Sequence, residues 1–208
     1  MTEALISGLL AGYGVAIPVG AIGVLILGLS ARTSLRVGAG AALGVAAADG
    51  IYALVAVLGG AAIASVIAPI ATPLRIIAAV VLLVIAVRVA VTAWRHHRDP
   101  ALAAATPTLT SPARAFAALL GLTLLNPATV IYFAALVLGH RATGSTSDPG
   151  TGTIFVLAAF AASASWQLFL AVGGSALGRY LSGPRGRLAT ALASTLLIVF
   201  LAVRTAIS

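Results

Sequence analysis

Long apolar stretches alternate with short polar segments along the whole chain. A membrane-spanning helix needs about 20 predominantly apolar residues, because the hydrocarbon core of a bilayer is roughly 30 Å thick. Six stretches meet this requirement, and they cover residues 4–30, 37–68, 74–94, 115–139, 153–181 and 188–207. The pattern therefore predicts an all-α polytopic membrane protein with six transmembrane helices.

The polar connectors between these spans are too short to form a domain of their own. We therefore expect residues 1–208 to form a single transmembrane domain. The amino-terminal segment has no basic residues and leads into an apolar stretch that is too long for a signal peptide, so we expect no cleavage there.

The composition supports the membrane class and excludes several others. Hydrophobic residues make up 61% of the chain and charged residues only 8%, with a mean hydropathy of +1.15, whereas soluble domains are about 25% charged. Cysteine is absent, which excludes disulfides and thiolate chemistry. The basic residues form no long run, so the expected partner is the lipid bilayer and not a nucleic acid.

All 12 basic residues are arginines, and their placement predicts the topology. Most lie in the first, third and fifth connectors, namely Arg32, Arg36, Arg95, Arg98, Arg114, Arg179, Arg185 and Arg187. Arg88 lies within the third predicted span, and its long side chain can reach the same side of the membrane as the third connector. Connectors on the other side and the carboxyl terminus hold only Arg75, Arg141 and Arg204. Cytoplasmic loops are enriched in basic residues, so we expect both termini outside.

Breaks at matching places give the chain a weak internal symmetry. Pro18 interrupts the first predicted span and Pro127 the fourth, while the second and fifth spans both contain a Gly-Gly pair, at residues 59–60 and 173–174. Two halves of three spans each would have opposite orientations in the membrane, as in inverted-repeat transporters with broken helices near the midplane. The alternative is that these residues are simple kinks and close-packing points, which are common in transmembrane helices.

The symmetry divides the chain into two repeats. We expect a first three-helix repeat at residues 1–94, a cytoplasmic linker at 95–113 and a second three-helix repeat at 114–208. Glycine-rich faces at residues 8–14 and 38–44 predict close helix packing and are compatible with a homodimer.

Asp49 is the only carboxylate deep inside an apolar stretch, in a chain with four acidic residues altogether. An ionised side chain at this depth is costly unless it faces a polar cavity or a partner, so it is a candidate functional residue by default. The alternative is a protonated or hydrogen-bonded aspartate that holds two helices together.

Motifs spread over nearly the whole chain resemble those of the lysine exporter (LysE/RhtB-type) translocators. They are GVAIPVG at residues 14–20, GLSARTSLRVG at 28–38, GVAAADG at 44–50, PLRII at 73–77 and GLTLLNP at 121–127. The resemblance implies a secondary transporter of the bacterial inner (plasma) membrane that exports amino acids or related small molecules, driven by the proton gradient.

The residues after the first break differ from the pattern of that family. Its members commonly carry a second proline followed by a polar residue after the first break, whereas this chain continues with Ala21 and Ile22. The wider superfamily includes cation exporters. A cation or metal-ion exporter, or a channel, with Asp49 as the ion ligand is therefore the alternative function.

The expected transport site combines Asp49 as the proton-coupling group with polar residues near the two breaks. Amide and aromatic side chains would line it, and the broken backbone would contribute exposed polar groups. The members are Pro18, Gly20, Tyr52, Asn126, Pro127, Trp166 and Gln167, with Tyr13, Tyr132, Ser163 and Ser165 as lesser options. Helix-to-helix hydrogen bonding and packing are the alternative roles of these side chains.

The sequence does not favour a membrane enzyme. It contains no HExxH motif, no GxSxG motif and no second carboxylate inside a span. Neither His96-His97 nor His140 has the spacing and carboxylate neighbour that favour a zinc site. We therefore expect no cofactor and no bound metal.

Overall fold

The computed structural model is almost entirely helical over the residues that it describes. These are residues 1–18, 20–67, 110–126 and 149–180, with shorter pieces at 73, 76–77, 80, 83–84, 87–88, 90–91, 129, 132–133, 192–193, 195–200 and 203. The helices are α1 (Thr2–Ala16), α2 (Ala21–Arg32), α3 (Leu35–Ile67), α5 (Pro112–Leu124) and α7 (Pro149–Tyr180). The predicted all-α class is confirmed over this part of the chain.

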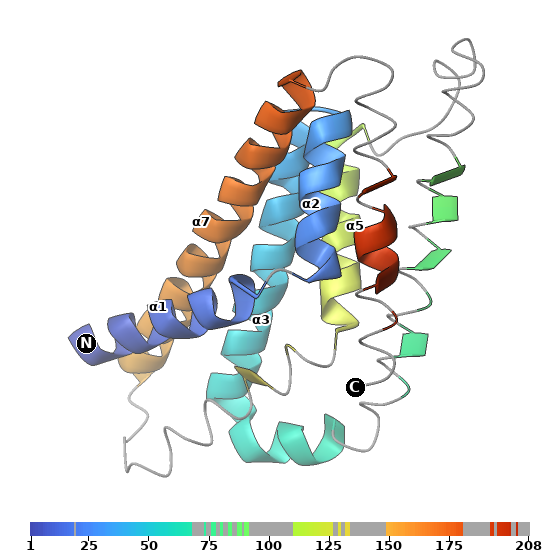
Figure 1. Cartoon of the computed structure of the whole chain (residues 1–208). Helices are drawn as coiled ribbons and strands as arrows, with labels where there is room; N and C mark the ends of the chain where they lie inside the picture. Colours follow the sequence, from blue (N-terminus) through green and yellow to red (C-terminus); the bar gives the residue numbers. More distant parts are fainter. Residues whose placement is uncertain are drawn as a thin grey trace.

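The first predicted span is broken, as the sequence indicates. Helix α1 ends at Ala16 and α2 begins at Ala21, with a bend of 76° between them. Ile17 still has helical backbone angles and donates its N–H to the carbonyl of Tyr13, but Pro18 has no backbone N–H to make the next helical bond, so α1 goes no further. Figure 1 shows the result: α1 crosses the lower part of α7, while α2 runs alongside the upper part.

Helices α3 and α7 are long and apolar enough to cross a membrane. Their spanning segments are Leu35–Leu58 and Gly150–Arg179, with mean hydropathies of 2.0 and 1.8. Helix α7 begins four residues before the predicted start at position 153, because Pro149 is tolerated in the first helical turn, where no backbone donor is needed. The second and fifth predicted spans are thus confirmed as helices.

Helix α5 stops where the fourth predicted span should break. It ends at Leu124, and the backbone N–H of Asn126 donates to the carbonyl of Thr123 at 2.9 Å. Pro127 lies outside the described residues. Most of the third and sixth predicted spans also lie outside them, and their described positions within 73–91 and 192–203 are helical.

Glycines allow three pairs of helices to approach backbone to backbone. A Cβ atom added at Gly12 of α1 would overlap the carbonyl of Ala159 on α7, and one at Gly174 of α7 would overlap that of Leu27 on α2. Gly44 of α3 meets the carbonyl of Phe116 on α5 in the same way. Close approach through small residues is the usual way for helices to associate in lipid. The predicted packing role of the two glycine-rich faces is confirmed.

These contacts also give the helix directions. Helices α1 and α2 both advance along α7 in its own chain direction: the contacts of α1 move from Gly8–Phe155 to Gly12–Ala159, and those of α2 move from Leu27–Gly174 to Ala31–Gly178. Helix α5 runs parallel to α3, because Gly40 lies beside Pro112 and Gly44 beside Phe116. These directions are those that an inverted repeat requires of the first, second, fourth and fifth spans. The arrangement of all six spans stays a prediction.

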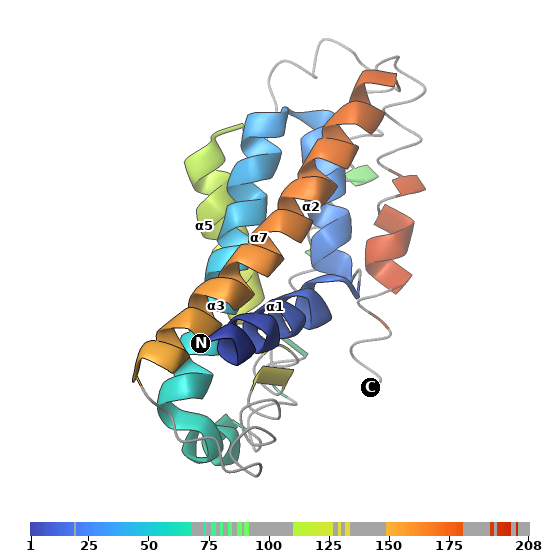
Figure 2. The same cartoon turned by 90° about the vertical axis from the view of Figure 1, so that its left-hand side faces the viewer.

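Apolar residues cover both the inside and the outside of the bundle. Ile26, Leu119 and Ile198 are buried in a core that joins α2, α3, α5, α7 and the segment near residue 198. On the outer faces, Leu10 and Phe169 are 68% and 63% exposed. Figure 2 shows α7 and α1 on this outer side. Exposed apolar side chains on helices of this length are what contact with lipid requires.

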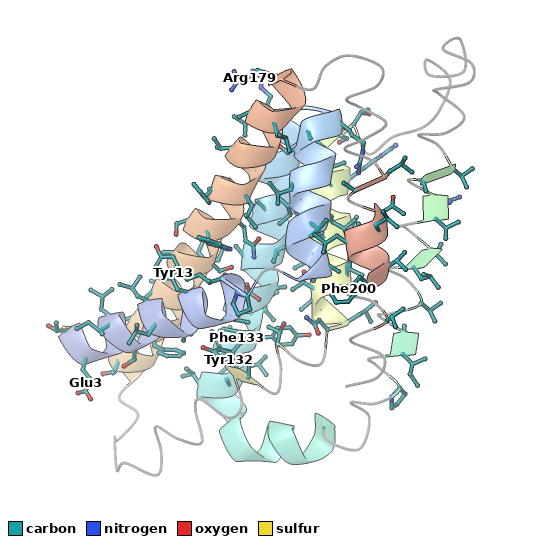
Figure 3. The ribbon with its side chains drawn as sticks, viewed as in Figure 1. Glu3, Tyr13, Tyr132, Phe133, Arg179 and Phe200 are labelled. Atoms are coloured by element: carbon teal, nitrogen blue, oxygen red, sulfur yellow. The ribbon has the colours of Figure 1, made fainter. Side chains whose placement is uncertain are left out.

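The described connector arginines gather at one end of the bundle. Arg32 ends α2 and Arg179 lies in the last turn of α7, where Gly178 contacts Ala31. Arg36 and Arg114 lie in the first turns of α3 and α5, which meet through Gly40 and Pro112. Figure 3 shows Arg179 at the opposite end from Glu3. This grouping is what the predicted topology requires.

Candidate functional site

Asp49 is buried at the contact between α3 and α7. Its side chain is 2% exposed, and Ser163 of α7, which is fully buried, donates a hydrogen bond from Oγ to Oδ2 at 2.6 Å. Gly50 follows Asp49 and leaves room for Phe160 of α7, since a Cβ atom added at Gly50 would lie 3.3 Å from the Phe160 ring. The buried carboxylate therefore has a defined partner on the opposite helix. This partner satisfies the requirement that an intramembrane acid be paired.

Tyr52 lies one helical turn after Asp49, on the same side of α3. Its hydroxyl donates a hydrogen bond to the backbone carbonyl of Leu124, the last residue of α5. The last carbonyls of a helix have no partner within the helix, so Tyr52 satisfies one of them. This bond connects the neighbourhood of Asp49 with the end of the fourth span.

Gln167 follows Ser163 by one turn on α7 and is 5% exposed. Within the described part of the chain, its buried Oε1 has no hydrogen-bond partner, and the same is true of Nε1 of Trp166. Trp166 is half-buried and packs on Phe169, with ring centroids 5.5 Å apart. A buried polar atom without a partner is costly, so these two atoms are candidates for contact with water or a substrate.

The other predicted site residues lie at the two breaks. Pro18 is exposed in the turn between α1 and α2. Gly20 caps α2 in an extended conformation, and a Cβ atom there would meet no described heavy atom within 4 Å. Asn126 directly follows the end of α5 and is partly buried. Pro127 lies outside the described residues, so its role in the site stays a prediction.

The first break and the end of α5 both lie close to Asp49 along the bundle. Tyr13, four residues before the first break, has its hydroxyl 2.9 Å from Oγ of Ser165, only two residues beyond Ser163 on α7. After the break, α2 meets α7 where Leu27 lies beside Gly174. The first break is therefore within about two turns of Ser163 along α7. On the other side, the bond from Tyr52 places the end of α5 one turn from Asp49.

The lesser candidates separate into two groups. Ser163 contacts Asp49. Ser165 is exposed, donates its hydroxyl proton to the carbonyl of Ala162 at 2.8 Å, and so accepts the bond from Tyr13. Tyr132 packs edge-on against Phe133, with ring centroids 5.6 Å apart. Ser163 is thus the polar residue whose importance the sequence understated. The signal was its separation from Asp49, which equals the separation of the two Gly-Gly pairs.

Within the described residues, no group of three or more His, Asp or Glu side chains could hold a metal ion. Asp49 has one hydroxyl partner and lies near a phenol and a buried amide. A buried carboxylate of this kind, on an apolar helix beside a broken span, is typical of secondary transporters. The fold and the site therefore define a helical membrane transporter.

The comparison with protein families agrees with this class. The model of the LysE type translocator family matches residues 14–208, and the chain belongs to this family. It is a family of transporters and not of enzymes, so its members handle a small-molecule substrate within a lipid bilayer. No curated protein and no solved structure matches the chain.

Proposed function

We propose that the chain exports amino acids or related small molecules across the bacterial inner (plasma) membrane, driven by the proton gradient. The coupling group is the carboxyl of Asp49. Membership in the LysE type translocator family supports the export of small molecules. The observation that carries the proton coupling is the buried carboxylate of Asp49, the only one among the described residues, which lies near the break of the first span and the end of α5.

The proposed cycle depends on the two protonation states of Asp49. The ionised carboxylate accepts the bond from Ser163, whereas the protonated form has a proton of its own to donate. A carboxyl that binds a proton when open to one side of the membrane and releases it when open to the other couples proton entry to substrate exit. Gln167, Trp166 and the groups at the breaks would hold the substrate.

Cation export, with Asp49 as a direct ligand, is the alternative. A hard cation such as Mg²⁺ takes about six oxygen ligands. The described surroundings of Asp49 offer the hydroxyl of Ser163 and the amide oxygen of Gln167, while the carbonyl of Leu124 already accepts from Tyr52. This supply of oxygens favours an organic substrate that makes a few directed hydrogen bonds.

Counterflow on the full-length chain in lipid vesicles tests the proposal. Vesicles are loaded with one of the standard amino acids or with Mg²⁺, Mn²⁺ or Zn²⁺, and the entry of the same labelled compound is measured. We expect transient accumulation of at least one amino acid and of no metal ion. Accumulation of a metal ion alone would replace the proposal by the cation alternative. Empty vesicles and vesicles with denatured protein are the controls.

A further inference from the structure

We propose that Ser163 is the positioning residue for Asp49: its hydroxyl fixes the carboxylate between α3 and α7 and sets the pH at which that carboxylate takes up its proton. The inference rests on the proposed function of Asp49 as the coupling acid. Asp49 belongs to the first predicted repeat and Ser163 to the second. The inference therefore makes both repeats contribute a residue to the proton-coupling step.

The contact has the properties of a strong, directed hydrogen bond. The 2.6 Å separation of Ser163 Oγ and Asp49 Oδ2 is in the range of O–H···O⁻ bonds, which are shorter and stronger than neutral ones. Small buried residues flank the pair in the sequence: Ala48 precedes Asp49 and is fully buried, and Ala162 precedes Ser163 and is 1% exposed. On the other side of Asp49, Gly50 has no side chain to keep Phe160 of α7 away from α3.

The direction of the bond depends on the proton. An ionised carboxylate can only accept, so it uses the hydroxyl proton of Ser163. Once Asp49 is protonated, Ser163 can instead donate to a backbone carbonyl one turn earlier in its own helix, a common bond for serine in helices. A donor that serves only the charged form stabilises that form, and its removal favours the protonated form.

Few other charges act on Asp49 from the described helices. Tyr52 is the nearest titratable group on α3, and its hydroxyl is bonded to α5. On α1, Tyr13 is exposed and contacts Ser165. The described arginines on α2, α3, α5 and α7 lie at the end of the bundle, roughly two turns or more from Asp49: Arg32, Arg36, Arg114 and Arg179. Among the described residues, Ser163 is therefore the group in direct contact with this carboxylate that can affect its protonation.

The hydrogen-bonded pair also matches the internal symmetry of the sequence. Ser163 follows Asp49 by 114 positions, which is also the separation between the Gly-Gly pairs at residues 59–60 and 173–174. In an inverted repeat, this bond joins equivalent positions of the two halves, at the interface where such transporters build their sites. A proton on Asp49 would thus change a contact between the halves that alternate in access.

The test uses the full-length chain in lipid vesicles, with protons as the only ligand. The carboxylic C=O infrared band of Asp49, assigned by its loss in Asp49→Asn, is titrated against pH. We expect Ser163→Ala to move the midpoint upward by about one pH unit, because the charged form loses a donor. We expect Ser163→Thr, which restores a hydroxyl, to return it toward the wild-type value. Ser163→Cys, with a weak donor, should lie between Ala and wild type.

Ser165→Ala is the matched control, since it removes a hydroxyl from the same helix that bonds Tyr13 and not Asp49. We expect it to leave the midpoint unchanged. An unshifted midpoint in Ser163→Ala, or an equal shift in Ser165→Ala, would overturn the inference. Should Ser163→Ala not fold, Ser163→Cys decides the matter in the same way. The titration needs no transport, so failure of the proposed function appears separately, as vesicles that carry no amino acid.

Discussion

Tyr52 links two parts of the site at the scale of single residues. It stands one turn from Asp49 and donates its hydroxyl proton to the end of α5. Leu124 is the last residue of α5, and its carbonyl would otherwise lack a partner within the helix. The contact fixes the broken fourth span beside the carboxylate.

Tyr52→Phe should therefore weaken both the fold and transport. Loss of this bond leaves a helix-end carbonyl unpaired and should lower the free energy of unfolding by about 1 kcal/mol. We expect slower amino-acid counterflow at equal folded yield, because the end of α5 is no longer fixed next to Asp49. Tyr13→Phe is the matched control, since it removes a hydroxyl that contacts Ser165 on the other side of α7. Equal counterflow in the two variants would contradict the linking role of Tyr52.

Single residues also show how far the sequence could predict the site. Asp49 was predictable because a carboxylate in an apolar span is costly wherever the helix faces. The burial of Gln167, and the lack of a partner for its Oε1 among the described residues, depend on which face of α7 is turned inward, and that face is set by packing in three dimensions. Ser163 is a residue type common in packed membrane helices; its separation from Asp49 matches that of the Gly-Gly pairs, but the hydrogen bond itself depends on the α3–α7 register.

The packing of α3 on α5 depends on glycine at the scale of helices. Gly44→Ala places a methyl group on the carbonyl of Phe116, which belongs to the backbone and cannot rotate away. The helices must separate, and overpacking of this kind costs typically about 1–3 kcal/mol. We expect a lower melting temperature in detergent and weaker transport, because α5 moves away from Tyr52.

Gly121→Ala on α5 is the control for this prediction. A Cβ atom there would meet no described heavy atom within 4 Å, and alanine favours a helix more than glycine does. We expect an unchanged or slightly higher melting temperature. A melting temperature for Gly44→Ala as high as that for Gly121→Ala would contradict the close contact between α3 and α5.

The helices were largely predictable, and the reason is physical. Hydropathy fixes where a span begins and ends to within a few residues, and proline marks where α1 and α5 stop. The 76° bend between α1 and α2 was not predictable, because proline permits a bend but neighbouring helices set its size. In this chain α7 sets the size of the bend, because α1 packs on the first half of α7 and α2 packs on the second half.

The orientation of the whole molecule follows from the arginine-rich end. Arg32, Arg36, Arg114 and Arg179 lie together there, so we expect this end in the cytoplasm and both termini outside. Reporter fusions at residue 33, residue 110 and the carboxyl terminus check the orientation. A cytoplasmic carboxyl terminus would contradict the six-span topology and, with it, the two inverted repeats at residues 1–94 and 114–208.

Two further properties of the whole molecule stay predictions. The described glycines of α1, α3 and α7 are used in packing within the chain, so a homodimer would have to form through other faces. The inverted repeat requires that the third and sixth spans take equivalent places beside the four described ones. Crosslinking in membranes and a structure of the full bundle would check these two properties.

The most direct test of the account compares uphill transport with exchange in the same vesicles, for the wild type and Asp49→Asn. Asparagine keeps the size of the side chain but cannot carry a proton between the two sides of the membrane. We predict that Asp49→Asn abolishes accumulation of the amino acid identified by counterflow under an imposed pH gradient. Exchange of that amino acid, which needs no net proton movement, should continue. Uphill transport at the wild-type level in Asp49→Asn would contradict proton coupling through this carboxylate.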